Sequence, residues 1–315
     1  MVTTDQLRRS KAVHRRTGRT FYLATRLLPE RVRHPTYVLY AFFRKADEVV
    51  DDAKGVSPER QREQLDHIRT QVLGEQPPTD PVFEAFRTVK NEYDIADRHV
   101  REFLDAMYTD IETTRYDTYA QLETYIEGSA AAVGQMMTTI MQPEDPERAR
   151  PYARKLGQAF QLTNFLRDVR EDVVDRNRIY LPRETLSAHG VTEAQIQRLE
   201  MSDGFARAMR LELRRTEALY RAAVPGISLL PRDCQFPVLL ASVLYADHHR
   251  AIRDCGFDVL NVEPRIGTKR KLSLLVRTYV HWRLSGDPET VFRRISAISY
   301  PPNEDRRPVP VAGAN

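Results

Sequence analysis

Two segments of the sequence each place a pair of aspartates four residues apart. Asp47 and Asp51 lie in YAFFRKADEVVDD (40–52), and Asp168 and Asp172 lie in QLTNFLRDVREDVVDRNRIYLP (161–182). Like charges at this spacing destabilise a helix by roughly 0.2–0.5 kcal/mol. A divalent cation would remove that repulsion, and Mg²⁺ binds through one or two carboxylates together with phosphate oxygens and water. The two pairs therefore predict a site for Mg²⁺, or Mn²⁺ in its place, and diphosphate.

The second pair is predicted to lie at the border of an apolar helix face. A helix advances about 100° per residue, so Gln161, Asp168 and Asp172 fall within an arc of roughly 40°, with Asn164 at its edge. The apolar stripe of this helix is centred roughly 120° away. A solvated face would place its acids opposite the stripe, so the pattern favours carboxylates that line a cavity between helices.

The first pair repeats this design. Tyr40, Arg44, Asp47 and Asp51 stand at i, i+4, i+7 and i+11, within an arc of roughly 60°, and apolar residues occupy the neighbouring arc. One acidic pair alone is also typical of a solvated surface helix. Two pairs of the same design, each with polar companions on its arc, favour a functional site.

Several other kinds of site are excluded by the residue types. The acidic segments lack the His or Cys ligands of zinc and copper sites and the Glu-x-x-His of di-iron bundles. The sequence also lacks the glycine-rich loops with which P-loop and dinucleotide-binding proteins bind phosphate. The remaining interpretation of the two acidic segments is a site in which carboxylates act through a metal ion.

The elements that must position these residues are helices. Apolar residues recur with helical spacing in nine segments, and sustained period-two alternation is absent. The predicted helices cover residues 35–53, 59–74, 81–93, 97–110, 118–141, 147–176, 203–224, 234–254 and 269–285. The breaks between them contain Pro and Gly and are too short for domain linkers. We expect one all-α domain over residues 1–298 and a disordered, Pro-rich tail over 299–315. Segment 130–141, rich in small and soft residues, is a candidate cavity wall.

Composition limits the kinds of partner and the cellular compartment that we expect for the protein. The chain has 315 residues, a net charge of +4 and two cysteines, which suits a reducing cytoplasm. No apolar run reaches the roughly 18 residues that span a bilayer. No nucleic-acid-binding motif accompanies the basic excess, so we expect no nucleic-acid partner, and attraction to an anionic substrate or to anionic lipid explains the charge instead.

At these residues the sequence resembles the squalene/phytoene synthase family, and most closely its phytoene-forming branch. The resemblance is carried by RTFYLATRLLPERVRHPTYVLYAFFRKADEVVDD (19–52), by YIEGSAAAVG (125–134) and by QLTNFLRDVREDVVDRNRIYLPRETLSAHGVT (161–192). Weaker likeness continues through LYADHHRAIRDCGFDVL (244–260). Together these segments span roughly residues 14–275.

The resemblance implies the isoprenoid synthase fold, in which helices surround a central cavity and the two aspartate pairs face each other. It assigns Mg²⁺-diphosphate binding, and hence catalysis, to Asp47, Asp51, Asp168 and Asp172. It also implies a set of substrate-binding residues: Thr20, Tyr40, Arg44, Tyr125, Gln161, Asn164, Tyr180, Tyr245 and Arg265. The register of Arg265 is ambiguous, because the expected Arg-rich element reads LNVEPRIGTKRK here.

The implied reaction joins two geranylgeranyl diphosphates head to head. Loss of the first diphosphate leaves an allylic cation, and attack by the second substrate gives a cyclopropyl (prephytoene) diphosphate. A second ionisation, rearrangement and proton loss give phytoene, the first committed product of carotenoid biosynthesis, without NADPH. Because the product is a hydrocarbon, we expect the enzyme to be cytoplasmic and to attach peripherally to membranes.

Three alternatives stay open at the level of sequence. Squalene synthase would use two farnesyl diphosphates and NADPH, and dehydrosqualene synthase would use the same C15 substrate without reduction. A non-catalytic relative acting as a scaffold would be expected to lose the aspartates, whereas both pairs are intact. The oligomeric state is not predicted.

Overall fold

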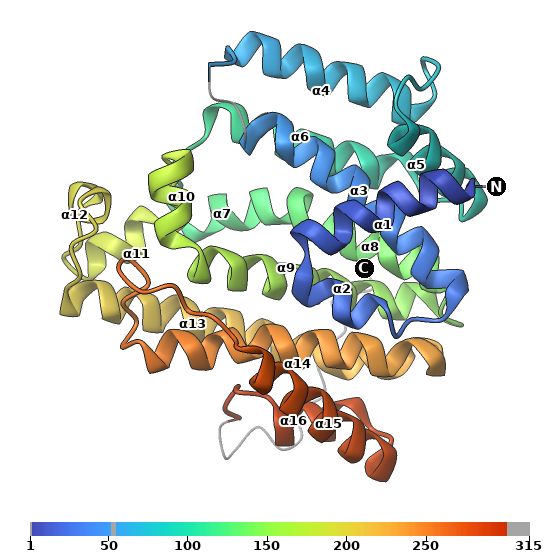
Figure 1. Ribbon diagram of the computed structural model, residues 1–315. Helices are drawn as coiled ribbons and strands as arrows, with labels where there is room; N and C mark the ends of the chain where they lie inside the picture. Colours follow the sequence, from blue (N-terminus) through green and yellow to red (C-terminus); the bar gives the residue numbers. More distant parts are fainter. Residues whose placement is uncertain (1, 52–54, 301–315) are drawn as a thin grey trace, which may run out of the picture.

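The protein is a bundle of helices, described by a computed structural model over residues 2–51 and 55–300 (Figure 1). The first half contains α1 (Thr4–Thr17), α2 (Arg19–Thr25), α3 (Glu30–Asp51), α4 (Pro58–Leu73), α5 (Pro81–Glu92), α6 (Asp97–Glu112), α7 (Tyr119–Ile126), a π-helical turn η1 (Glu127–Ala131) and α8 (Ala132–Met141). The second half contains α9 (Pro146–Arg167), α10 (Val169–Arg176), α11 (Arg183–Ala188), α12 (Glu193–Gln197), α13 (Asp203–Ala223), the 3₁₀ turn η2 (Val224–Leu229), α14 (Arg232–Asp254), α15 (Thr268–Ser285) and α16 (Pro288–Ile295). The described residues form no β-strand, and one isolated bridge joins Arg115 to Ile179.

Local sequence sets where the helices begin and end. Asp80 accepts a hydrogen bond from the Val82 amide at 2.7 Å, and Asp145 accepts one from the Arg148 amide at 3.0 Å. A proline follows each of these caps directly, where the missing N–H would be unpaired in any case. At the other end, Gly286 stops α15 with a φ of 65°, a left-handed conformation that glycine adopts without strain.

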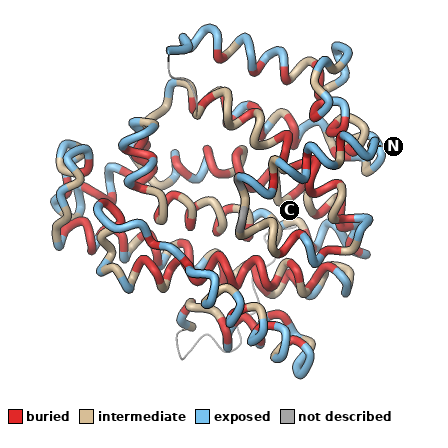
Figure 2. The backbone as a smooth tube through the Cα atoms, in the orientation of Figure 1, coloured by how far each residue is buried: buried red, intermediate tan, exposed pale blue. Residues whose placement is uncertain are grey.

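Helix α9 runs through the middle of the molecule and contacts α8, η1, α13 and α14 (Figure 1). Helices α1 and α3–α6 lie on one side of it, and α13–α16 lie on the other. Buried apolar residues form three clusters: one that joins α3 to α8, one among α9, α13, α14 and α16, and one that joins α10–α13 to the end of α14. Figure 2 shows that buried stretches recur along most helices.

Glycine allows α9 to approach both α8 and the turn η1 closely. A Cβ added to Gly134 would lie 2.5 Å from the Ala153 carbonyl oxygen, and one added to Gly157 would lie 2.5 Å from the Ala130 carbonyl oxygen. Real Cβ atoms do not come this close to a carbonyl, so both positions require glycine for the observed packing. The contact fixes the two helices that form one wall of the cavity described below.

The all-α prediction is confirmed, with one correction in the second acidic segment. The helix predicted over 147–176 is interrupted at Asp168, whose φ of −101° and ψ of 16° lie outside the helical range. The hydrogen bonds from Asp168 N to Asn164 O (2.8 Å) and from Asp172 N to Asp168 O (2.9 Å) persist, so the chain bends without losing its backbone pairing. This bridge region of φ/ψ space is one where active-site residues are often found.

Two further predictions concern the C-terminal tail and membrane-spanning helices. The tail predicted over 299–315 lies outside the described residues from 301 onward, and in its first part the Ser299 carbonyl accepts a hydrogen bond from Arg221 at 3.0 Å. Among the helices of the described residues, none is both long enough and apolar enough to cross a membrane.

Candidate active site

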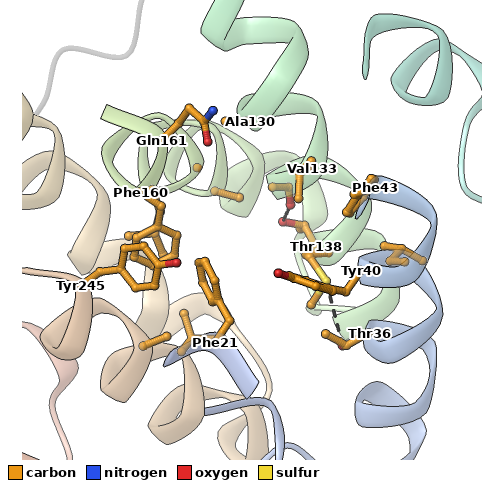
Figure 3. Close-up of a pocket in the computed structure, with 18 of the residues that line it drawn as sticks. Phe21, Thr36, Tyr40, Phe43, Ala130, Val133, Thr138, Phe160, Gln161 and Tyr245 are labelled. Atoms are coloured by element: carbon orange, nitrogen blue, oxygen red, sulfur yellow. Dashed lines mark hydrogen bonds between the residues drawn. The ribbon is translucent and has the colours of Figure 1, made fainter. Parts of the chain in front are cut away.

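A cavity of about 610 Å³ lies between the two halves of the bundle. In Figure 3, Tyr40 and Phe43 enter it from α3, opposite Phe21, Phe160 and Tyr245. Its wall along α9 runs from Ala149 to Asn164, which is about 22 Å at 1.5 Å per residue. The cavity is therefore long in one direction, and it has the shape expected for an extended ligand.

Most of the cavity wall is apolar. Segment 130–141 contributes Ala130, Val133, Gly134, Met137, Thr138 and Met141, which confirms its prediction as a wall segment. The acidic and basic side chains of the lining come from α3 and α10, beside two amides of α9. We call this set the polar end of the cavity: Arg44, Asp47, Gln161, Asn164, Glu171 and Arg176.

Asp47 brings a carboxyl group from α3 to the polar end. Burial raises the pKa of Asp47 to about 8, the neighbouring Asp51 adds to the shift, and Arg44 opposes it. A cation beside this carboxyl would favour its ionised form. Asp47 is therefore a residue whose surroundings suit a positive ligand.

Asp172 brings a second buried carboxyl group, from α10. It is 8% exposed, and burial raises its pKa well above the usual range, against the influence of Arg176 and with a contribution from Asp168. Asp168 itself is held by the neighbouring guanidinium of Arg167, which donates to both of its carboxylate oxygens.

Arg176 joins the two aspartate segments. Its guanidinium lies 3.4 Å from Asp51 on α3, 3.1 Å from Asp172 and 2.8 Å from Glu171, both on α10. Arg178, which is buried, adds a 2.9 Å ion pair to Asp51. The two segments, more than 100 residues apart in sequence, therefore meet through arginines that neutralise their acids.

Several predicted aromatic and polar residues lie along the same cavity, and others do not. Tyr40, Tyr125 and Tyr245 are among its lining residues, as are Arg44, Gln161 and Asn164. Tyr180 stacks on Phe165, with ring centroids 3.7 Å apart, and reaches the cavity wall only through its neighbour Tyr125.

Thr20 and Arg265 stand apart from the cavity lining. Asp51, Asp168 and Asp172 are also absent from the lining, and they are held beside it by ion pairs with Arg176 and Arg167. Thr20 Oγ1 accepts a hydrogen bond from Lys271 Nζ at 3.3 Å. Arg265 has a 77% exposed side chain that pairs with Glu263. The structure does not bring Arg265 to the acidic end, so its assignment to substrate stays a prediction from the resemblance alone.

Comparison with known proteins identifies the family. A family model described as squalene/phytoene synthase matches residues 14–274 of the chain.

The chain belongs to the squalene/phytoene synthase family.

Curated relatives and a solved structure agree with this membership. A phytoene synthase from Arthrospira platensis is 30% identical over 272 residues, which cover 82% of this chain and 87% of that one. A 15-cis-phytoene synthase from Synechococcus elongatus is 30% identical over 271 residues, which cover 82% and 88%. A crystal structure of a dehydrosqualene synthase in complex with ligand superposes with a TM-score of 0.80 and 25% identity, and covers 89% of this chain and 97% of that one. The isoprenoid synthase fold expected from the sequence is confirmed.

The residues at the acidic end of this squalene/phytoene synthase family member fit a magnesium ion that arrives with phosphate. Over residues 2–51 and 55–300, no three His, Cys, Asp or Glu side chains gather closely enough to hold a metal unaided. Mg²⁺ seldom needs such a cage, because it keeps waters and shares phosphate oxygens. Asn164 Oδ1 is buried on the cavity wall without a hydrogen-bond partner among the described residues, and it is an oxygen donor of the kind that hydrated Mg²⁺ binds.

Sequence reasoning missed four residues of this synthase-family site. Arg176 and Glu171 line the cavity, and Arg178 ties Asp51 to α6 through a 2.9 Å hydrogen bond to the Asp110 carbonyl. Asp110 accepts the Tyr125 hydroxyl at 2.6 Å, and burial raises the pKa of its carboxyl to about 6. The signal for the arginines was their place directly after the acidic run, in DRNR (175–178). Asp110 had no local signal, because its role depends on contacts across helices.

Proposed function

We propose that this family member condenses two geranylgeranyl diphosphates head to head to phytoene, with release of both diphosphates, as the first committed step of carotenoid biosynthesis. The observation that carries the proposal is one long cavity that is apolar over most of its wall and acidic and basic at one end. A prenyl diphosphate has the same division into apolar chain and charged head. The C20 chain length and the phytoene product rest on the two curated relatives.

We assign the handling of diphosphate to the polar end. Asp47, Asp51, Asp168 and Asp172 would hold Mg²⁺, or Mn²⁺ in its place, together with the substrate phosphates. When bound, the metal supplies the positive charge that stabilises the leaving diphosphate. Arg44 lines the same end and adds a fixed positive charge where negative charge develops.

The rest of the cavity protects the cationic stages of the reaction. Loss of the first diphosphate gives an allylic cation, which the double bond of the second substrate attacks. The attack moves the positive charge to the second substrate, and loss of a proton then closes the ring of the cyclopropyl diphosphate. The second ionisation and rearrangement end in proton loss, so this reaction needs no NADPH. Walls such as Phe21, Val133 and Phe160 would exclude water that otherwise captures the cations.

The test is product analysis with labelled substrates. The purified protein is incubated with Mg²⁺ and labelled geranylgeranyl or farnesyl diphosphate, each with and without NADPH. We expect a C40 hydrocarbon identified as phytoene from the C20 substrate, independent of NADPH. A C30 product made from the C15 substrate without NADPH would indicate a dehydrosqualene synthase, and dependence on NADPH a squalene synthase. No hydrocarbon under any condition would refute the enzymatic function and favour a scaffold role.

We also propose that the enzyme works in the cytoplasm at a membrane surface. A C40 hydrocarbon has negligible solubility in water, so release into lipid favours turnover. The proposal needs a surface on the protein that binds lipid.

A further inference from the structure

Helix α15 exposes an unusual number of large apolar side chains. Among the described residues, nine large hydrophobic side chains are exposed, and five of them belong to this helix. The five are Leu272, Val276, Tyr279, Val280 and Leu284. Because single exposed apolar residues are normal and clusters are not, the concentration on one helix indicates an interaction surface.

The exposed residues form one continuous face of a well-packed helix. Their spacing of three and four places them on one side, whereas Leu274, Thr278 and Trp282 are buried on the opposite side against the second core cluster. Helix α15 lies at the outer edge of the molecule, beyond α14 (Figure 1), and much of its course is exposed (Figure 2). We call the five exposed apolar residues the α15 face.

The N-terminal end of α15 is fixed to the body by a buried carboxylate. Asp247 on α14 is 1% exposed and accepts hydrogen bonds from Arg270 at 2.7 Å and from Arg250 at 3.1 Å. Both guanidinium groups lower the pKa of Asp247, so the carboxylate stays charged and the pairs persist at neutral pH. The α15 face is therefore presented already folded, without an ordering cost on binding.

The charge of α15 is entirely basic. Residues 268–285 contain five Lys or Arg and no Asp or Glu, and Lys269, Arg277 and Arg283 are exposed. A surface helix with an apolar face and several basic residues suits the interface of an anionic membrane. A second copy of this chain fits less well, since a symmetric contact would bring the same positive charges together.

The α15 face also lies close to the cavity wall. The Tyr279 ring packs edge-on against Phe236 of α14, with centroids 5.6 Å apart. The next two residues of α14, Pro237 and Val238, line the cavity. Helix α14 thus lies between the cavity and the α15 face, with Phe236 against α15 and Pro237 and Val238 on the cavity wall.

From these observations we propose that the α15 face docks the enzyme on anionic lipid, with its apolar residues in the headgroup boundary and its basic residues on lipid phosphates. The docking surface goes beyond the proposed function, and its use for product release rests on that function.

The test is flotation of the full chain with vesicles of phosphatidylcholine alone or with added phosphatidylglycerol. We expect wild type to float with the anionic vesicles and to stay behind with the neutral ones. The variant Val276→Glu/Leu284→Glu should lose flotation, and Arg277→Gln/Arg283→Gln should weaken binding roughly thirty-fold, at about five-fold per basic residue. The matched control is Val56→Glu, which changes an exposed valine before α4 and should float like wild type.

Two readouts separate the possible outcomes. Turnover of detergent-dispersed substrate should stay within about two-fold of wild type in all three variants, since none changes a cavity residue. Equal flotation of wild type and the α15 variants would overturn the docking proposal, and so would a change from dimer to monomer in Val276→Glu/Leu284→Glu by light scattering. Absence of a C40 product from wild type would refute the proposed function and leave the flotation result to be judged separately.

Discussion

At the scale of single residues, the acidic end of the cavity is defined by carboxyl groups in unfavourable surroundings. Asp172 is buried and Asp47 is half-buried, and desolvation together with nearby acids raises the pKa of both. Groups held in such surroundings often serve function at the expense of stability. The same burial that costs stability in the absence of a cation strengthens the binding of one.

Asp47→Asn and Asp168→Asn are expected to remove activity and keep the fold. Each amide keeps the shape of the carboxyl group but has no negative charge with which to bind a metal ion. Turnover should therefore fall roughly 10²–10³-fold or more. The measurements are product formation and the far-UV helical spectrum. In the absence of divalent ions, Asp47→Asn should melt at or above the wild-type temperature, because a disfavoured buried charge is gone. Retained turnover in either variant would contradict the metal assignment.

His14 is expected to make the fold sensitive to acid. It is buried against Tyr40, with rings stacked 3.9 Å apart, and burial lowers its pKa from 6.5 to about 3. Between these values the unfolded chain binds a proton that the folded protein excludes, so stability falls as pH drops from about 6.5 toward 3, by at most about 1.4 kcal/mol per pH unit.

Denaturant unfolding of wild type and His14→Phe between pH 7 and pH 4 measures this effect. The variant keeps the stacked ring and loses the titrating nitrogen atoms, so its stability should depend less steeply on pH. A residual slope from His248, whose pKa burial also lowers to about 3, is expected in both proteins. Identical slopes would show that His14 is not excluded from protonation in the fold.

At the scale of elements, the long helices were predictable and the irregular ones were not. The helices predicted over 81–93 and 203–224 end within one residue of α5 and α13, because amphipathic periodicity and caps agree there. Helices α1, α2, α11, α12 and α16 lie outside the nine predicted segments. The last four have only five to eight residues and show too little periodicity, and α1 is mostly charged and polar, with few apolar residues. The bend at Asp168 and the π-helical turn η1 depend on packing between helices, which periodicity within one segment does not record.

The close contact of α8 with α9 gives a prediction at this scale. Gly134→Ala would press its Cβ on the Ala153 carbonyl, and relief requires the two helices to move apart, at a cost of roughly 1–3 kcal/mol. The matched control is Gly267→Ala, where the added Cβ meets no atom within 4 Å. Equilibrium unfolding should separate the two variants. Equal stability would mean that the α8–α9 contact adjusts freely.

At the scale of the whole molecule, the sequence predicted part of the cavity lining. Asp47, Gln161 and Asn164 line one cavity together with segment 130–141, whereas Asp51, Asp168 and Asp172 are not among the lining residues. The arginines that join the segments were not predicted, because an Arg in a charged run can face any direction. The position of Arg265 relative to the cavity was not predictable, because its register depends on the irregular segment between α14 and α15.

The length of the cavity should set the length of the substrate. Ala153 lines it on α9, eleven residues from Asn164 at the polar end, or about 16 Å. Ala153→Phe would fill this distant part, so we expect activity with the C20 diphosphate to fall at least ten-fold and activity with the C15 diphosphate to persist. Parallel assays with both substrates measure the ratio. The control is Arg148→Phe, an exposed position on the same helix, which should leave the ratio unchanged.

The arginines between the two acidic segments bear on the stability of the protein without substrate or metal. Because Arg176 and Arg178 form ion pairs with Asp51 and Asp172, we expect the chain to fold without a metal ion. Treatment with a chelator should therefore abolish turnover and leave the melting temperature almost unchanged. A zinc finger, by contrast, unfolds when its metal is removed. We therefore expect the folded chain to be stable without a divalent ion, and an unchanged melting temperature after chelation would confirm it.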